Sequence, residues 1–126
     1  MNQEWTAVAC PDVRIDSLRR ELLRDAEQLV AAVDAHRYRE LLSLAGKLLA
    51  TAREQFQAEE RRLREARAPS LVRHAGEHER FLTDVGSIVA LAAQGDTDGV
   101  EALRPERFIP DWLSAHARTD RDLTAG

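Results

Sequence analysis

Three pairs of polar residues, each pair four apart in the sequence, have the side chains that a metal site needs. They include three of the four histidines of the chain. A helix brings residues four apart onto one face, so each pair can point its side chains in one direction. Imidazole and carboxylate groups together suit iron, zinc, manganese or copper, and helical bundles build such sites in their cores. The pairs are Gln55 and Glu59, His74 and His78, and His116 and Asp120.

A hydrogen-bonded polar core without a metal is the alternative, because histidine pairs at this spacing also occur on helix surfaces. The neighbouring residues favour burial. His74 and His78 share a face with Phe81, and Glu59 lies three residues after an aromatic residue. His116 follows a Trp-Leu pair. Imidazoles on an inward face are costly unless they are hydrogen-bonded or ligated, and a buried carboxylate among neutral imidazoles calls for a cation.

Helices must position these side chains, and the apolar residues follow helical spacing almost throughout. No strand pattern competes with it. Four helices with mostly short connections predict an all-α fold, an antiparallel up-down-up-down four-helix bundle that forms one domain over residues 1–126. The predicted helices run from about Val13 to Ala35, from near Arg37 to about Ala66, from Leu71 to about Gln94, and from near Pro105 to about Leu123.

Single residues mark the helix ends. Ser70 is predicted to cap the start of the third helix, and Gly95 to cap its end. His36 lies near the end of the first predicted helix, where the helix dipole favours a positively charged side chain. The segment Val100–Leu103 is compatible with one helical turn. Pro110 conflicts with the fourth helix, because a proline inside a helix removes one hydrogen bond and should either kink the helix or mark a later start.

Composition narrows the function classes. The chain has 126 residues, 44% of them hydrophobic and 32% charged, and a formal net charge of −4. Its basic residues are interspersed with acidic ones, which excludes a nucleic-acid footprint. No apolar run approaches the ~20 residues of a membrane span, and no catalytic constellation predicts an enzyme.

The lone Cys10 indicates a reducing compartment, so we expect a cytoplasmic protein. Residues 1–12 are predicted to form an extended arm anchored by Trp5.

Taken in order, these motifs resemble those of the bacterial hemerythrins over nearly the whole chain. The family pattern is an aromatic arm, Ile-Asp-x-x-His, His-Phe-x-x-Glu-Glu, His-x-x-x-His and Trp-Leu-x-x-His with a following Asp. The corresponding residues are Trp5, Ile15, Asp16, Phe56, Glu59, Glu60, His74, His78, Phe81, Leu82, Trp112, Leu113 and His116.

The resemblance implies a four-helix bundle with two non-haem irons, bridged by an oxygen atom and two carboxylates, that binds dioxygen without a porphyrin. By the same resemblance, His74, His78 and His116 would hold one iron. Glu59 and Asp120 would be the carboxylates near it. Asp120 lies four residues after His116, whereas the family spaces this acid by five, so Asp122 is the alternative.

Two departures remove the ligands of the other iron. The family's first histidine is Arg19 here, and its histidine before Phe is Gln55. Arginine offers no lone pair to a metal, and glutamine offers only a weak carbonyl oxygen. We therefore expect one metal ion, with Arg19 facing inward as a replacement for the second cation and Gln55 hydrogen-bonded to Glu59.

Iron is the expected metal, with two irons or zinc as alternatives. The expected function is to bind or sense a small diatomic ligand such as dioxygen or nitric oxide. Two other functions stay open, a di-iron dioxygen-binding protein of the usual family type and a metal-free bundle that binds a protein partner. The sequence leaves the oligomeric state open.

Overall fold

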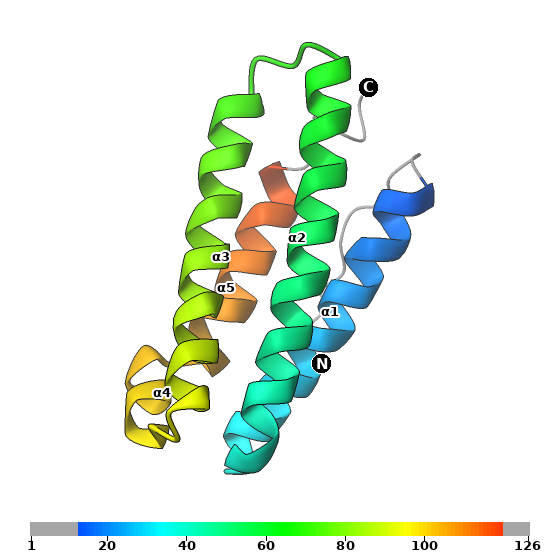
Figure 1. Ribbon diagram of the computed structural model, residues 1–126. Coiled ribbons are helices and arrows are strands. Elements are labelled where there is room, and N and C mark those ends of the chain that lie inside the picture. The colour runs from blue at the N-terminus through cyan, green and yellow to red at the C-terminus, as the bar shows by residue number, and fades with distance from the viewer. Residues whose placement is uncertain (1–12, 120–126) are drawn as a thin grey trace.

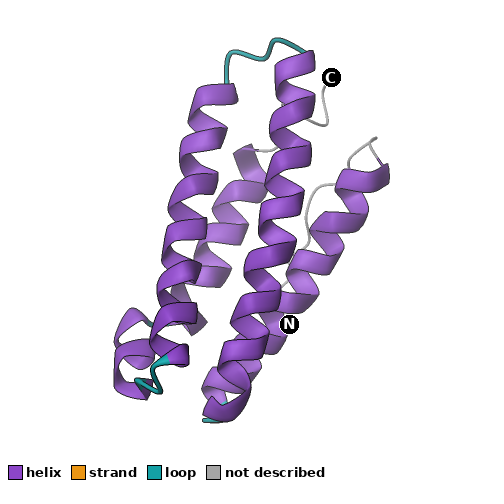
Figure 2. Ribbon diagram, viewed as in Figure 1, coloured by secondary structure: helices purple, strands orange, loops and turns teal. Residues whose placement is uncertain are grey.

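The structure, a computed structural model, describes residues 13–119, and every regular element among them is a helix (Figures 1 and 2). The predicted all-α class is therefore confirmed. The arm with Trp5, Cys10, and the acidic residues Asp120 and Asp122 lie outside the described residues. The elements are α1 (Val13–Asp34), the 3-10 helix η2 (Tyr38–Glu40), α2 (Leu41–Glu65), α3 (Leu71–Ala93), α4 (Thr97–Leu103) and α5 (Pro105–Thr119).

The four long helices pack against one another in the way a helical bundle requires. Helix α2 lies between α1 and α3 and packs against both, while α5 packs against α1 and α3 from behind (Figure 1). The short α4 packs against α3 at one end of the molecule. Each long helix is apolar on one stripe, and burying that stripe against its neighbours stabilises the fold.

The apolar core runs most of the length of the bundle. On α1 the buried positions recur every three or four residues, which is the spacing of one helix face. The largest fully buried apolar side chains are Ile15, Leu22, Leu29, Leu41, Leu48, Phe56, Leu63, Phe81, Ile88 and Ile109.

Three helices end in the same way, with one residue in the left-handed conformation. His36, Arg67 and Gly95 have φ values of 56°, 52° and 71°. In each case the residue that follows donates its N–H to a carbonyl five residues earlier, as in a Schellman motif. The predicted role of Gly95 after α3 is thereby confirmed. His36 ends α1 in the same way, and its imidazole contacts Tyr38 and Glu101 instead of α1 carbonyls.

The structure corrects several local predictions. Ser70 precedes α3, but its side chain makes no capping hydrogen bond. The segment predicted as one helical turn is the helix α4, which Asp96 caps through its side chain. Its Val100 is fully buried, and that burial explains why the helix forms. Pro110 lies inside α5, which continues through it from Pro105. The second long helix begins with the 3-10 turn η2 before α2.

Candidate metal centre

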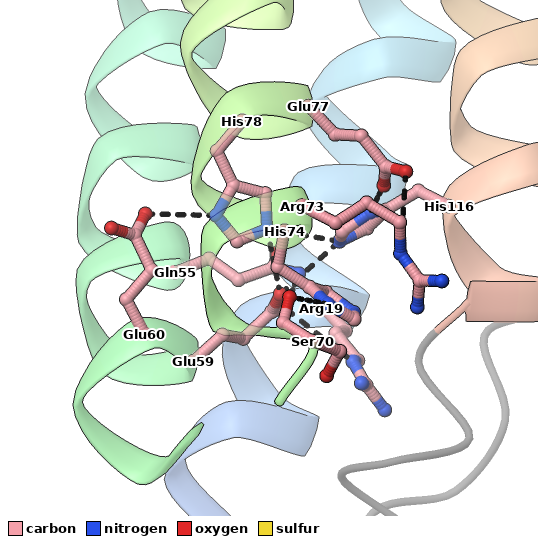
Figure 3. A network of polar contacts seen from close by, with 10 residues as sticks. All are labelled: Arg19, Gln55, Glu59, Glu60, Ser70, Arg73, His74, Glu77, His78 and His116. Carbon is pink, nitrogen blue, oxygen red and sulfur yellow. Dashed lines mark hydrogen bonds and ion pairs between the residues drawn. The ribbon is translucent and has the colours of Figure 1, made fainter. Parts of the chain in front are cut away.

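The polar side chains singled out in the sequence meet inside the bundle (Figure 3). Because α1, α2, α3 and α5 each turn one stripe inward, residues far apart in the chain share one buried layer. Their exposed fractions are at most 5%. Arg19 comes from α1, Gln55 and Glu59 from α2, His74 and His78 from α3, and His116 from α5.

Three of these side chains form a tight group. The Oε1 atom of Glu59 lies 3.1 Å from Nε2 of His78 and 3.1 Å from Nε2 of His116. The two Nε2 atoms are 3.3 Å apart. Ligand atoms at about 2.0–2.1 Å from a tetrahedral metal ion are about 3.3 Å from one another. The group therefore has the size and the donor atoms that a metal ion needs.

Two of the imidazoles have a hydrogen-bond acceptor beside their outer nitrogen. Nδ1 of His78 lies 2.9 Å from Oε2 of Glu60, and Nδ1 of His74 lies 3.1 Å from the Ser70 carbonyl oxygen. Nδ1 of His116 faces Oε2 of Glu77 at 3.7 Å, which is an ion-pair distance and too long for a hydrogen bond. For His78 and His74, an Nδ1–H bond to the acceptor would fix the tautomer and leave Nε2 with a lone pair, as in the outer shell of metal-bound histidines.

Aromatic rings hold two of the imidazoles in place. The Phe56 ring stacks on His78 with centroids 4.0 Å apart and an interplanar angle of 4°. Trp112 stacks on His116 at 4.5 Å and 18°. Phe56 is itself fully buried, and its ring lies 5.5 Å from that of Trp112. The apolar contacts restrict ring rotation, so the Nε2 atoms are preorganised toward Glu59.

Arg19 and Gln55 occupy the side of Glu59 that faces away from the imidazoles. The guanidinium Nε of Arg19 lies 3.7 Å from Oε2 of Glu59, and both side chains are buried. Gln55 donates from Nε2 to the same oxygen at 2.5 Å. The Gln55 Oε1 atom has no hydrogen-bond partner within residues 13–119. One carboxylate oxygen thus faces a permanent cation and an amide, and the other faces two imidazoles.

The charge state of Glu59 follows from these neighbours. In the metal-free protein, burial raises the pKa of the Glu59 carboxyl group, but hydrogen bonds donated by the Nε2–H groups of His116 and His78, and the positive charges of these imidazoles when protonated, outweigh burial. The net effect holds the pKa of Glu59 well below its usual range. Glu59 is therefore an anion at neutral pH and can serve as a metal ligand.

Two predicted ligands stand apart from this group. His74 lies in the same buried layer, with its ring centroid 6.1 Å from that of His78 and 5.9 Å from that of His116. It is beside the group of Glu59, His78 and His116, whose ligand atoms lie within 4.8 Å of one another. Asp120 falls outside the described residues, as does Asp122.

Sequence reasoning missed two carboxylates that support the imidazoles, Glu60 and Glu77. Glu60 was part of the recognised Glu-Glu pair, but neighbours in a helix point about 100° apart, so spacing along α2 gave it no role. Its contact with His78 depends on how α2 and α3 face each other. For Glu77 the sequence contains one signal, because it lies four residues after Arg73 and the two can pair along one helix face. In the structure, Nε of Arg73 lies 4.0 Å from Oε1 of Glu77.

Searches against protein-family models, characterised proteins and solved structures found no match for this chain. None of the helices within residues 13–119 has both the length and the apolar character that crossing a bilayer requires.

Proposed function

We propose that this chain is a hemerythrin-like, non-haem metal-binding protein that holds one metal ion and binds or senses a small diatomic ligand. The observation that carries the proposal is the convergence of Glu59 Oε1 with the Nε2 atoms of His78 and His116 in a buried layer. Three lone-pair donors this close repel one another unless a proton or a cation lies among them. A metal ion would take the place of the Nε2 protons, and the acceptor on Nδ1 of His78 would keep the other nitrogen of that ring protonated.

The contacts of Arg19 and Gln55 support a single ion. In the hemerythrins that the sequence resembles, the residues at these two positions are ligands of the second iron. Here a guanidinium approaches the outer oxygen of Glu59, and an amide donates to it. A second dication beside Arg19 would be repelled by its charge and would find no imidazole there. Arg19 thus supplies the positive charge that the second iron would otherwise bring.

His74 and one carboxylate from residues 120–122 are proposed to complete the ligand set. The fold in this proposal is the up-down-up-down bundle with an N-terminal arm. Iron is the metal that the resemblance favours, although imidazole and carboxylate also satisfy zinc. A ferrous ion with an open position supplies affinity for dioxygen or nitric oxide. Reversible dioxygen carriage in hemerythrins uses two electrons from two irons, so a single ion favours ligand binding or sensing over carriage.

Absorption spectroscopy of the iron-loaded protein in air tests the proposal. An oxo-bridged iron pair gives strong near-ultraviolet bands, which a single iron lacks. We expect the wild type to bind iron without showing these bands. We expect His116→Ala to retain no iron. His36→Ala is the matched control, since His36 is exposed at the far end of α1. Strong bridge bands would favour the di-iron alternative. Absence of any bound metal would favour the metal-free, partner-binding alternative.

A further inference from the structure

A pocket of about 210 Å³ lies between α3 and α5, on the outer side of His116. Its lining is Glu77, Arg80, Trp112, Ala115 and His116. A divalent ion with six waters needs about 180 Å³, at about 30 Å³ for each water. The pocket is therefore large enough for a hydrated metal ion to enter before it loses water.

His116 is the side chain of the site that lies nearest this pocket. It is 5% exposed, whereas His78 and Glu59 are 1% and 0% exposed. Its ring lines the pocket, and its Nε2 atom lies 3.1 Å from Glu59 Oε1. A route from the pocket to the other two ligands would require this one imidazole to turn out of its stacked position against Trp112.

Glu77 lines the pocket beside His116 and carries a carboxylate. Its Oε2 faces Nδ1 of His116 at 3.7 Å, and its Oε1 lies 4.0 Å from Nε of Arg73 (Figure 3). Glu77 is partly exposed. A carboxylate reachable from solvent and next to a buried ligand can bind an incoming cation and pass it on. Arg80, at the exposed edge, opposes this with its positive charge.

We propose that this pocket is the route by which a divalent metal ion reaches Glu59, His78 and His116, and that Glu77 is the first protein ligand it meets. The inference rests on the proposed metal-binding function. If the route is correct, a side chain that fills the pocket slows uptake and release together. The equilibrium affinity then stays the same, because the bound state is untouched.

The experiment follows uptake of Co²⁺ by the full-length apoprotein, using the visible absorption of the bound ion in a stopped-flow instrument. Ala115→Leu fills the pocket from its exposed edge and is expected to slow both uptake and release several-fold with an unchanged Kd. Ala50→Leu, at an exposed position of α2, is the matched control. Circular dichroism verifies that both variants fold.

Arg80→Gln is expected to have the opposite effect on the rate of Co²⁺ uptake. Removing a cation from the path of a dication is expected to speed uptake by up to about tenfold at low salt. Arg53→Gln removes the same charge from an exposed site on α2 and should leave the rate unchanged. Opposite effects of the Ala115 and Arg80 variants on uptake would support the route.

One result would overturn the route alone, namely Co²⁺ uptake that Ala115→Leu leaves at the wild-type rate, whether or not the Kd changes. No Co²⁺ binding by the wild type would contradict the proposed function, so the two failures are distinguishable.

Discussion

His78 lies between two carboxylates, with Nε2 at 3.1 Å from Glu59 Oε1 and Nδ1 at 2.9 Å from Glu60 Oε2. The two carboxylates act differently on the ring. Glu59 is fully buried and contacts the Nε2 atoms of both His78 and His116. Glu60 is partly exposed and accepts a hydrogen bond from Nδ1 of His78. At the scale of single residues, this hydrogen bond fixes which nitrogen of His78 faces the site.

Glu60→Ala tests this orientation. Losing the acceptor for Nδ1 should weaken metal affinity about 10–100-fold, as removal of such outer partners does in other metal sites. The measurement is a Co²⁺ titration of the apoprotein. Glu65→Ala, an exposed residue near the end of the same helix, is the control and should bind as the wild type does. Equal affinities for the two variants would show that Glu60 does not orient the ring.

Histidines at positions 19 and 55 test the proposed explanation for a single ion. The double variant Arg19→His with Gln55→His should bind two metal ions per chain, because it replaces a buried cation and an amide with two ligands beside Glu59. Each single variant should still bind one. Elemental analysis gives the count, and circular dichroism reports whether the bundle is intact. A folded double variant that gains no second ion would count against the placement of these residues at a second site.

Spacing, apolar neighbours and the resemblance to hemerythrins together predicted that Glu59, His78 and His116 would meet. The four-residue spacing fixed only which side chains share a helix face. It left open how two helices align with each other. That alignment decides which outer carboxylate each imidazole meets, as with Glu60 and His78. It also places His74 beside the tight group instead of within it.

At the scale of the helices, α5 combines a function with a structural cost. It supplies Trp112 and His116 to the site, yet Pro110 interrupts its backbone hydrogen bonds. The helix persists because packing offsets the loss, with Ile109 and Leu113 buried on either side of the proline. The sequence pattern exposed this conflict, but tertiary packing decided its outcome.

Pro110→Ala is expected to stabilise the protein. The alanine restores a backbone donor for the Glu106 carbonyl and should raise the free energy of unfolding by up to about 3 kcal/mol. Urea denaturation of the apoprotein measures the change. Asp111→Ala, at an exposed position of the same helix, controls for the helix propensity of alanine. A Pro110 variant no more stable than this control would show that the proline is accommodated without cost.

Helix α4 contains the helical turn expected at Val100–Leu103 but begins earlier, at Thr97. Its seven residues are too few to give a clear helical period, so only a turn was predicted. Two features stabilise it, the Asp96 side chain, which accepts from the Gly99 N–H at 2.8 Å, and the buried Val100. The first is a local signal that the sequence contains. The second depends on the neighbouring α3 and could not be predicted from α4 alone.

At the scale of the whole molecule, polar contacts stabilise the end of the bundle opposite the site. The Tyr38 hydroxyl donates to Glu101 of α4, and the ring of His36 contacts the same hydroxyl. These contacts join the α1–α2 connection to α4, which the chain reaches sixty residues later. They stabilise the geometry of the end without taking part in metal binding.

The ionisation of Tyr38 tests this contact. The hydrogen bond to Glu101, with smaller effects of burial and nearby carboxylates, raises the pKa of Tyr38 to about 12. Because the pKa of the folded state is raised, the contact stabilises below pH ~10 and is lost as the pH rises toward 12. Tyr38 is the only tyrosine, so phenolate absorption reports on it alone. Glu101→Gln should return the pKa toward 10, and identical titrations of both proteins would contradict the contact.

Metal content per chain is the most direct test of the central claim that Glu59, His78 and His116 hold one ion. The apoprotein is loaded with excess Fe²⁺ without oxygen, freed of unbound metal and measured by elemental analysis. The account predicts close to one ion per wild-type chain and almost none in His78→Ala. Two ions per wild-type chain, no ion at all, or full retention by the variant would contradict it.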